Sequence, residues 1–286
     1  MNINNTFFTL AIVLLVSLLS GCSSIQSLKK ESISTVISVD GSAIIYGVRG
    51  QGDVTVVFVH CWTCNHEFWR PQIERFSNKH KVVWLDLAGH GLSSSKRHKY
   101  TMAAFGADVA AVVNKIGGDN IVLVGHSMGG PVAIEAAKLL GDKVIGIVGV
   151  DTFYTPFEYP KSESAINGFV KPFEADFYGT SEQMVRSMFT PKADPDLIQS
   201  IVNQMAAANQ EMGVSAIHEI FRWNIKNVPS TLDHYSKKLR NINGAPTGKE
   251  VALHKNVTLI PGVGHFVAQV KPDAFNKALC KIIDEF

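Results

Sequence analysis

The sequence predicts an α/β fold in which a mostly parallel sheet is covered by helices on both faces. Short, nearly continuous apolar runs such as 54–59, 121–124 and 144–150 alternate with segments of helical length. Strands that are apolar on both sides are typical of parallel sheets, because helices cover both faces of such a sheet. The chain has 286 residues, of which 46% are hydrophobic, and this length can bury a large core without a disulfide or a metal.

The first 28 residues contain no Lys, Arg, Asp or Glu, and we interpret residues 1–21 as a signal peptide outside the fold. Phe7–Leu19 is an apolar run of 13 residues, which suits a secretory signal and is shorter than the ~20 residues of a membrane-spanning helix. The following Leu19-Ser20-Gly21-Cys22 resembles a bacterial lipobox. This resemblance implies a lipid at Cys22, a tether over 22–34 and a place in the cell envelope, facing the periplasm or the exterior. The outer membrane is favoured over the inner, and an uncleaved anchor or a plain signal peptide is the alternative.

Residues 35–286 are predicted to form one domain, which begins with a hairpin over 34–48 around Asp40-Gly41. The later elements alternate in type along the chain, as expected for a parallel sheet. Strands are expected over 54–59, 81–85, 121–124, 144–150 and 257–260, and helices over 66–79, 101–116, 129–140 and 272–283.

A segment rich in aromatic residues interrupts this alternation between residues 153 and 228. It shows helical patterns near 181–189, 195–210 and 213–225, separated by Pro and Gly. We predict a helical cap inserted after the sixth strand and lying over one edge of the sheet. Most of its aromatic side chains are expected to fill the core of the cap, and a minority to line a substrate cleft.

A sharp turn is predicted between the strand over 121–124 and the helix over 129–140. It contains Gly125-His126-Ser127-Met128-Gly129, which is the G-x-S-x-G pattern in the strand–turn–helix context that places a Ser hydroxyl at a helix N-terminus. Gly125 and Gly129 remove side chains that would collide across the turn, and the helix end favours developing negative charge. Ser127 is therefore the candidate nucleophile.

Together with three further segments, this turn resembles the α/β-hydrolase fold family over roughly residues 35–286. His60-Cys61-Trp62 resembles the family's His-Gly-x oxyanion loop, and Asp86–Ser93 resembles its D-x-x-G-x-G-x-S turn. Gly262-Val263-Gly264-His265-Phe266 resembles the segment that carries the family's catalytic His. The resemblance implies an α/β-hydrolase fold but does not specify a substrate.

The resemblance implies a Ser-His-acid triad in which His265 is the base. The family's usual acid position after the seventh strand has no Asp here, because residues 236–272 contain only Glu250 as a carboxylate, which is expected on a short helix. Asp151 directly follows the sixth strand, where some α/β-hydrolases carry the acid, and it is the favoured candidate. Glu250, or no functional acid at all, are the alternatives.

An enzyme of this kind also needs two backbone N–H groups directed at the oxyanion. By analogy with the family, Met128 and Trp62 would supply them. Cys61 stands where the family usually has Gly, which puts the backbone angles of this loop in question. The spacing of Cys61 and Cys64 allows a disulfide in an oxidising compartment. A metal or redox role for this pair is the less favoured interpretation, since no second ligand cluster is present.

The net charge of +2 argues against a nucleic-acid-binding protein with a basic surface. No metal cluster or phosphate-binding Gly-rich loop occurs in the sequence, so no cofactor and no metal are expected. We predict a serine hydrolase of small ester-like substrates that is anchored to the membrane through Cys22. A haloalkane dehalogenase or an epoxide hydrolase of this fold is disfavoured, because these enzymes use an Asp nucleophile and this chain has Ser127. An inactive binding protein, an aminopeptidase, a carbon–carbon bond hydrolase and a cofactor-free haloperoxidase are the alternatives, and the oligomeric state stays open.

Overall fold

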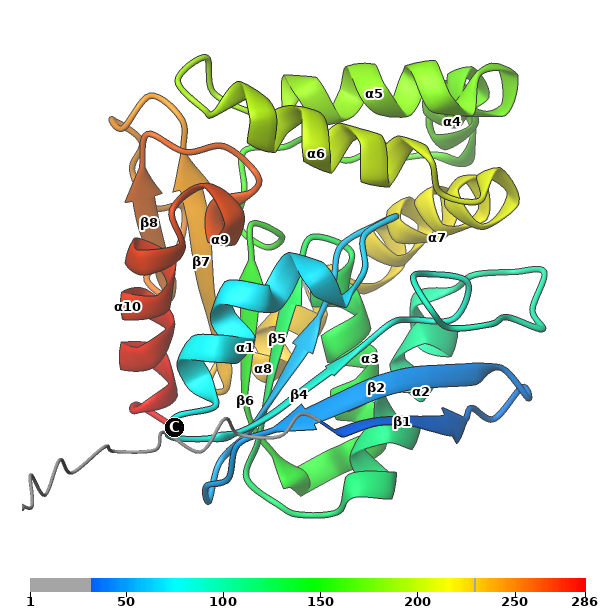
Figure 1. Cartoon of the computed structure of the whole chain (residues 1–286). Helices are drawn as coiled ribbons and strands as arrows, with labels where there is room; N and C mark the ends of the chain where they lie inside the picture. The colour runs from blue at the N-terminus through cyan, green and yellow to red at the C-terminus, as the bar shows by residue number, and fades with distance from the viewer. Residues whose placement is uncertain (1–31, 229) are drawn as a thin grey trace, which may run out of the picture.

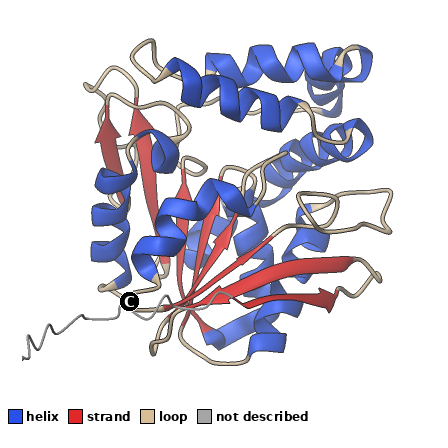
Figure 2. Cartoon of the chain, in the orientation of Figure 1, coloured by secondary structure: helices blue, strands red, loops and turns tan. Residues whose placement is uncertain are grey.

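The computed structural model describes residues 32–228 and 230–286 (Figures 1 and 2). The predicted signal peptide, Cys22 and most of the predicted tether lie outside the described residues. No helix in the described ranges is long and apolar enough to cross a membrane.

The sheet has eight strands in the order β1-β2-β4-β3-β5-β6-β7-β8. The pairs β1–β2 and β2–β4 are antiparallel, and all other neighbouring strands are parallel. The predicted mostly parallel sheet is therefore confirmed. The strands are β1 (Ser32–Ile37), β2 (Ala43–Arg49), β3 (Thr55–Val59), β4 (Lys81–Leu85), β5 (Ile121–His126), β6 (Val144–Val150), β7 (Leu239–Ala245) and β8 (Val257–Pro261).

Helices cover both faces of this sheet, and the side chains of each inner strand alternate between the two layers. In β3, Val57 and Val59 belong to the core beneath α2 (Met102–Ile116) and α3 (Gly129–Leu140). Val56 and Phe58 belong to the opposite core, beneath α1 (Arg70–Phe76) and α10 (Pro272–Ile283). A strand with apolar residues at successive positions thus supplies both cores, as its continuous apolar run predicts. Short helical segments complete the core domain: η1 (His66–Trp69), η2 (Gly141–Lys143), α8 (Ser230–Tyr235) and α9 (Val267–Val270).

Four helices between β6 and β7 form the cap and lie above the carboxyl end of the sheet (Figure 1). They are α4 (Glu163–Ala175), α5 (Phe177–Ser187), α6 (Pro195–Ala206) and α7 (Gln210–Asn227). The sequence patterns did not predict α4, which contains Gly168 and Pro172, two residues that are normally unfavourable inside helices. Its start is stabilised by the Ser162 hydroxyl, which accepts a hydrogen bond from the Ala165 N–H.

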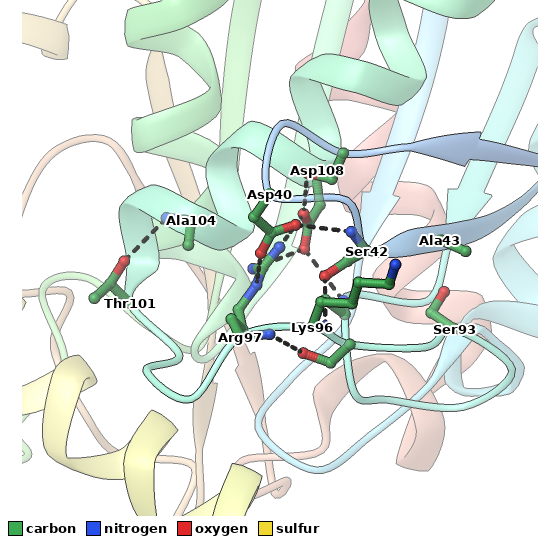
Figure 3. A network of polar contacts seen from close by, with 12 residues as sticks. Asp40, Ser42, Ala43, Ser93, Lys96, Arg97, Thr101, Ala104 and Asp108 are labelled. Carbon is green, nitrogen blue, oxygen red and sulfur yellow. Dashed lines mark hydrogen bonds and ion pairs between the residues drawn. The ribbon is translucent and has the colours of Figure 1, made fainter.

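A buried ionic network joins the β1–β2 turn, the loop after β4 and helix α2 (Figure 3). The guanidinium group of Arg97 contacts both carboxylate oxygens of Asp108, at 2.6 and 3.1 Å, and reaches Asp40 at 2.6 Å. The Ser38 hydroxyl donates to Asp108 at 2.6 Å and the Ala88 N–H donates at 3.2 Å. Asp108 is completely buried, and this burial raises the pKa of its carboxyl group although Arg97 opposes the shift. The network therefore holds the β1–β2 turn against the loop after β4 and the helix α2 that follows it.

We expect Arg97→Met to lower the free energy of unfolding by about 3–5 kcal/mol, because the change leaves the buried Asp108 carboxylate without its cation. Urea denaturation measures this loss. Lys79→Met is the matched control, since it removes a cation whose partner Asp284 is exposed and it should leave the stability nearly unchanged. A similar small effect for both variants would contradict the assignment of Arg97 to the stability of the fold.

Candidate active site

Ser127 lies in a sharp turn between β5 and α3, as predicted. Its φ angle is +53°, which is an uncommon conformation for a residue with a side chain. The turn is held by two backbone hydrogen bonds, from the Ser127 N–H to Val150 and from the Gly130 N–H to the Ser127 carbonyl, both 2.9 Å long. A Cβ atom at Gly125 would overlap the Gly129 carbonyl, so the glycine permits the chain to reverse so tightly. The strained conformation directs the Ser side chain away from its neighbours along the chain.

His265 and Asp151, which are 114 positions apart in the sequence, are joined by a hydrogen bond. His265 Nδ1 lies 2.6 Å from Asp151 Oδ2. The other carboxylate oxygen of Asp151 accepts a 2.9 Å hydrogen bond from the Gly244 N–H at the end of β7. Because both Asp151 oxygens are engaged, the carboxylate is oriented toward the imidazole ring. This arrangement selects the imidazole tautomer with its proton on Nδ1 and leaves Nε2 as the basic nitrogen.

Among the described residues no hydrogen bond or ion pair joins Glu250 to His265, and the short helix expected around Glu250 is absent from this segment. The residue lies in an irregular segment after the turn that follows β7. Its carboxylate accepts hydrogen bonds from the N–H groups of Thr247 and Lys249, and these bonds lower its pKa. The structure therefore brings Asp151, and not Glu250, to the imidazole ring.

Three residues outside the expected triad and oxyanion hole hold the loops of the site, and His126 among them already stands in the Gly125–Gly129 motif. Buried His126 donates from Nε2 to the His265 carbonyl at 3.0 Å, and burial keeps its pKa well below the usual value, so the ring is neutral. The Met188 carbonyl, at the end of α5, accepts a 3.0 Å hydrogen bond from the His265 N–H. Asn243 donates to the carbonyl of Phe153 at 2.9 Å, in the loop that follows Asp151. No sequence motif marks Met188 or Asn243, because their partners lie in distant segments.

A cavity of about 610 Å³ opens beside these residues and brings Ser127, Asp151 and His265 together in its wall. Trp62 and Met128, the expected oxyanion residues, line the same cavity. Within residues 32–228 and 230–286, their backbone N–H groups donate to no carbonyl. Each is thus available for a bound oxygen atom. Among the described residues no hydrogen bond joins Ser127 Oγ to His265, and such bonds in enzymes are often long until substrate binds.

The cap supplies most of the apolar wall of this cavity. Phe157, Tyr159, Phe169 and Phe221 line it, and they are a minority of the aromatic residues of the cap, as the sequence predicts. Burial raises the pKa of Tyr159 to about 12, and the nearby charge of Asp151 adds to this effect. The phenol therefore stays neutral. The remaining residues of the 153–228 segment in the wall are Thr155, Pro156, Met184, Ser187, Met188, Met205, Ile217 and Ile220.

The unusual backbone angle that the Gly-to-Cys difference suggests at Cys61 occurs instead at Thr63. Cys61 does not have a positive φ angle, whereas Thr63 has φ +55°, so the Gly-to-Cys difference is accommodated without a left-handed residue at position 61. Cys61 and Cys64 form a disulfide, and neither sulfur is a free thiolate for metal binding. The described residues contain no group of three or more His, Cys, Asp and Glu side chains placed to hold a metal ion.

The comparisons with known proteins agree with this architecture. A 2-(acetamidomethylene)succinate hydrolase of Mesorhizobium japonicum is 25% identical over 266 residues, which cover 86% of this chain and 94% of that protein. A non-heme haloperoxidase of Rhodococcus erythropolis is 27% identical over 277 residues, covering 87% and 98%. The structure of a thermophilic esterase from Thermogutta terrifontis matches with a TM-score of 0.73 at 20% identity, over 89% of this chain and 98% of the other. This last likeness concerns the fold alone.

The sequence profile of the alpha/beta hydrolase fold matches residues 54–201. This range is more than half of the chain and contains the Ser127 turn, the strand that ends at Asp151 and the first helices of the cap. Its match agrees with the observed sheet order and with the position of the cap after β6. The chain therefore belongs to the α/β-hydrolase fold family.

Proposed function

We propose that this protein is a serine hydrolase that cleaves carboxylic esters through an acyl-enzyme intermediate. One observation carries the proposal: Ser127 and the hydrogen-bonded pair of His265 and Asp151 line a single cavity. A Ser hydroxyl is a weak nucleophile unless a neighbouring base removes its proton. The cavity holds both groups and a carboxylate that orients the base.

In the proposed mechanism, Ser127 Oγ attacks the ester carbonyl carbon while His265 Nε2 takes the hydroxyl proton. Asp151 keeps the proton on Nδ1 and stabilises the imidazolium ion that forms. The amides of Trp62 and Met128 donate to the oxyanion of the tetrahedral intermediate. His265 then gives its proton to the leaving alcohol, and the acyl group stays on Ser127. Water, deprotonated by the same imidazole, attacks this acyl group and releases the acid.

Ser127→Ala should lower kcat for short p-nitrophenyl esters by at least about 10⁴-fold, because the variant lacks the hydroxyl group that carries the acyl group in the proposed mechanism. Stopped assays of nitrophenol release measure this loss, and labelling by a fluorophosphonate probe should disappear with it. Unchanged hydrolysis by the variant would exclude the mechanism. Failure of the unaltered protein to label would favour a non-catalytic binding protein of the same fold.

Asp151→Asn should lower kcat by about 10³- to 10⁴-fold, since the amide favours the wrong imidazole tautomer. Glu250→Gln is the matched control, because Glu250 is the alternative carboxylate and lies away from His265. We expect the control to retain the activity of the unaltered protein in the same nitrophenol assay. The reverse order of effects would assign the acid to Glu250.

The walls of the cavity favour an uncharged substrate with apolar groups. Lys and Arg are absent from the described residues that line it, and Asp151 is the acidic residue among them. Burying a carboxylate without a cation is unfavourable. The succinate-derived substrate in the name of the Mesorhizobium relative would therefore fit this cavity poorly.

Matched ester pairs test this preference. We expect p-nitrophenyl pentanoate to exceed the p-nitrophenyl ester of glutaric acid, which carries one terminal carboxylate more, by about tenfold or more in kcat/KM. Equal values for the two esters, measured at the same ionic strength, would show that the apolar wall does not select the acyl group.

A further inference from the structure

The turn that carries Trp62 is closed by a disulfide between Cys61 and Cys64, whose Cα atoms lie 5.2 Å apart. A backbone hydrogen bond of 3.2 Å from the Cys64 N–H to the Cys61 carbonyl spans the same turn. All four residues, 61–64, are buried. The proposed mechanism uses the backbone of Trp62 and gives no part to the two sulfur atoms, so their position needs a separate explanation.

The turn is strained at the residue after Trp62. Thr63 adopts φ +55°, a left-handed conformation that is unfavourable for a β-branched residue. Its buried hydroxyl oxygen has no hydrogen-bond partner among the described residues. Such a conformation persists only where surrounding structure imposes it, and the disulfide is the covalent constraint that spans this residue.

The first half of the turn is already held by other contacts. His60 Nδ1 donates to the Cys61 carbonyl at 2.8 Å, since its Nε2 accepts from the Leu87 N–H. The Trp62 indole N–H donates to the Gly213 carbonyl of α7 at 2.8 Å. These bonds place the Cys61 carbonyl and the Trp62 ring but leave the Trp62–Thr63 segment to be fixed from the Cys64 side.

We propose that the Cys61–Cys64 disulfide is a positioning element for the oxyanion hole, and that its reduction converts the enzyme to a form with low kcat. The inference rests on the proposed ester hydrolysis. A reductant can approach the disulfide through the substrate cavity, because Cys61 lines this cavity together with Ser127. A dithiol supplies two electrons and two protons: the S–S bond breaks, two S–H groups form, and the dithiol closes to its own cyclic disulfide.

Reduction of the full-length protein with dithiothreitol is the first test. We expect kcat for p-nitrophenyl butyrate to fall by about tenfold or more, toward the 10²- to 10³-fold loss that follows removal of one oxyanion donor. KM should change by less than about twofold, since the neutral ester makes little use of these amides before the transition state. Reoxidation should restore kcat, and a thiol count after denaturation verifies the redox state.

A transition-state analogue separates this role from a merely structural one. An alkyl trifluoromethyl ketone forms a tetrahedral adduct with a catalytic Ser and carries an oxyanion. Its inhibition constant should rise in the reduced protein by about the same factor as kcat/KM falls. A purely structural disulfide would change the thermal midpoint without this parallel change.

Two variants make the test independent of the reductant. The double variant Cys61→Ser, Cys64→Ser should have the low kcat of the reduced protein and be insensitive to dithiothreitol. Cys280→Ser is the matched control, because Cys280 is a free, half-buried cysteine in α10 outside the cavity. The control should keep full activity and full sensitivity to the dithiol.

The outcomes distinguish this inference from the proposed function. Full kcat in protein whose thiol count shows an open disulfide would overturn the inference, while loss of activity in Ser127→Ala would still support the mechanism. Activity that survives Ser127→Ala would overturn both. Unfolding of the reduced protein and of the double variant, seen by circular dichroism, would overturn the positioning role in favour of one in stability.

Discussion

The hydrogen bond between Asp151 and His265 sets the main geometric requirement of this structure. Asp151 follows β6 and His265 follows β8, and β7 lies between these two strands. The two loops can therefore meet only above the end of β7. Near that end lies Gly244, where a Cβ atom would overlap the carbonyl oxygens of the 263–264 loop. The Gly244 N–H also donates to Asp151, so one glycine both makes room for the loops and orients the carboxylate.

Asp151 has a positive φ angle of +45°, which also follows from the need to place its carboxylate beside His265. Directly after β6, the backbone directs the Asp151 carboxylate over the end of β7 and then continues into the cap. Asn243 stabilises this path by donating to the Phe153 carbonyl from beneath. Local strain at Asp151 is thus compensated by hydrogen bonds from the neighbouring strand β7.

The cap contributes to the site as well as to the cavity wall. The Met188 carbonyl of the segment after α5 accepts the hydrogen bond of the His265 N–H, and the Gly213 carbonyl in α7 accepts that of the Trp62 indole. Phe189 also stacks on Phe266, with ring centroids 4.6 Å apart. Displacement of the cap would therefore disturb the His265 loop and the Trp62 turn together.

Most of the fold and half of the candidate site could be predicted from local sequence signals. The apolar runs located the strands over 54–59, 81–85 and 144–150. The glycines around Ser127 and His265 marked two turns of the candidate site, because local sterics decide where such turns are allowed. Helix α4 was missed since Gly168 and Pro172 contradict helical propensity, and packing against α7 in the cap overrides that preference.

The sequence by itself therefore determined most strands and helices of the core domain and the residue types at the turns. These follow from side-chain periodicity and backbone sterics over a few residues. Only the tertiary structure decided that Asp151 rather than Glu250 meets His265, that the strain near Cys61 falls on Thr63, and that Met188 and Gly213 of the cap hold the site. Each of these depends on contacts between segments that are far apart in the chain. Such contacts leave no periodic signal in the sequence, because they form only when the sheet brings the carboxyl ends of its strands to one edge.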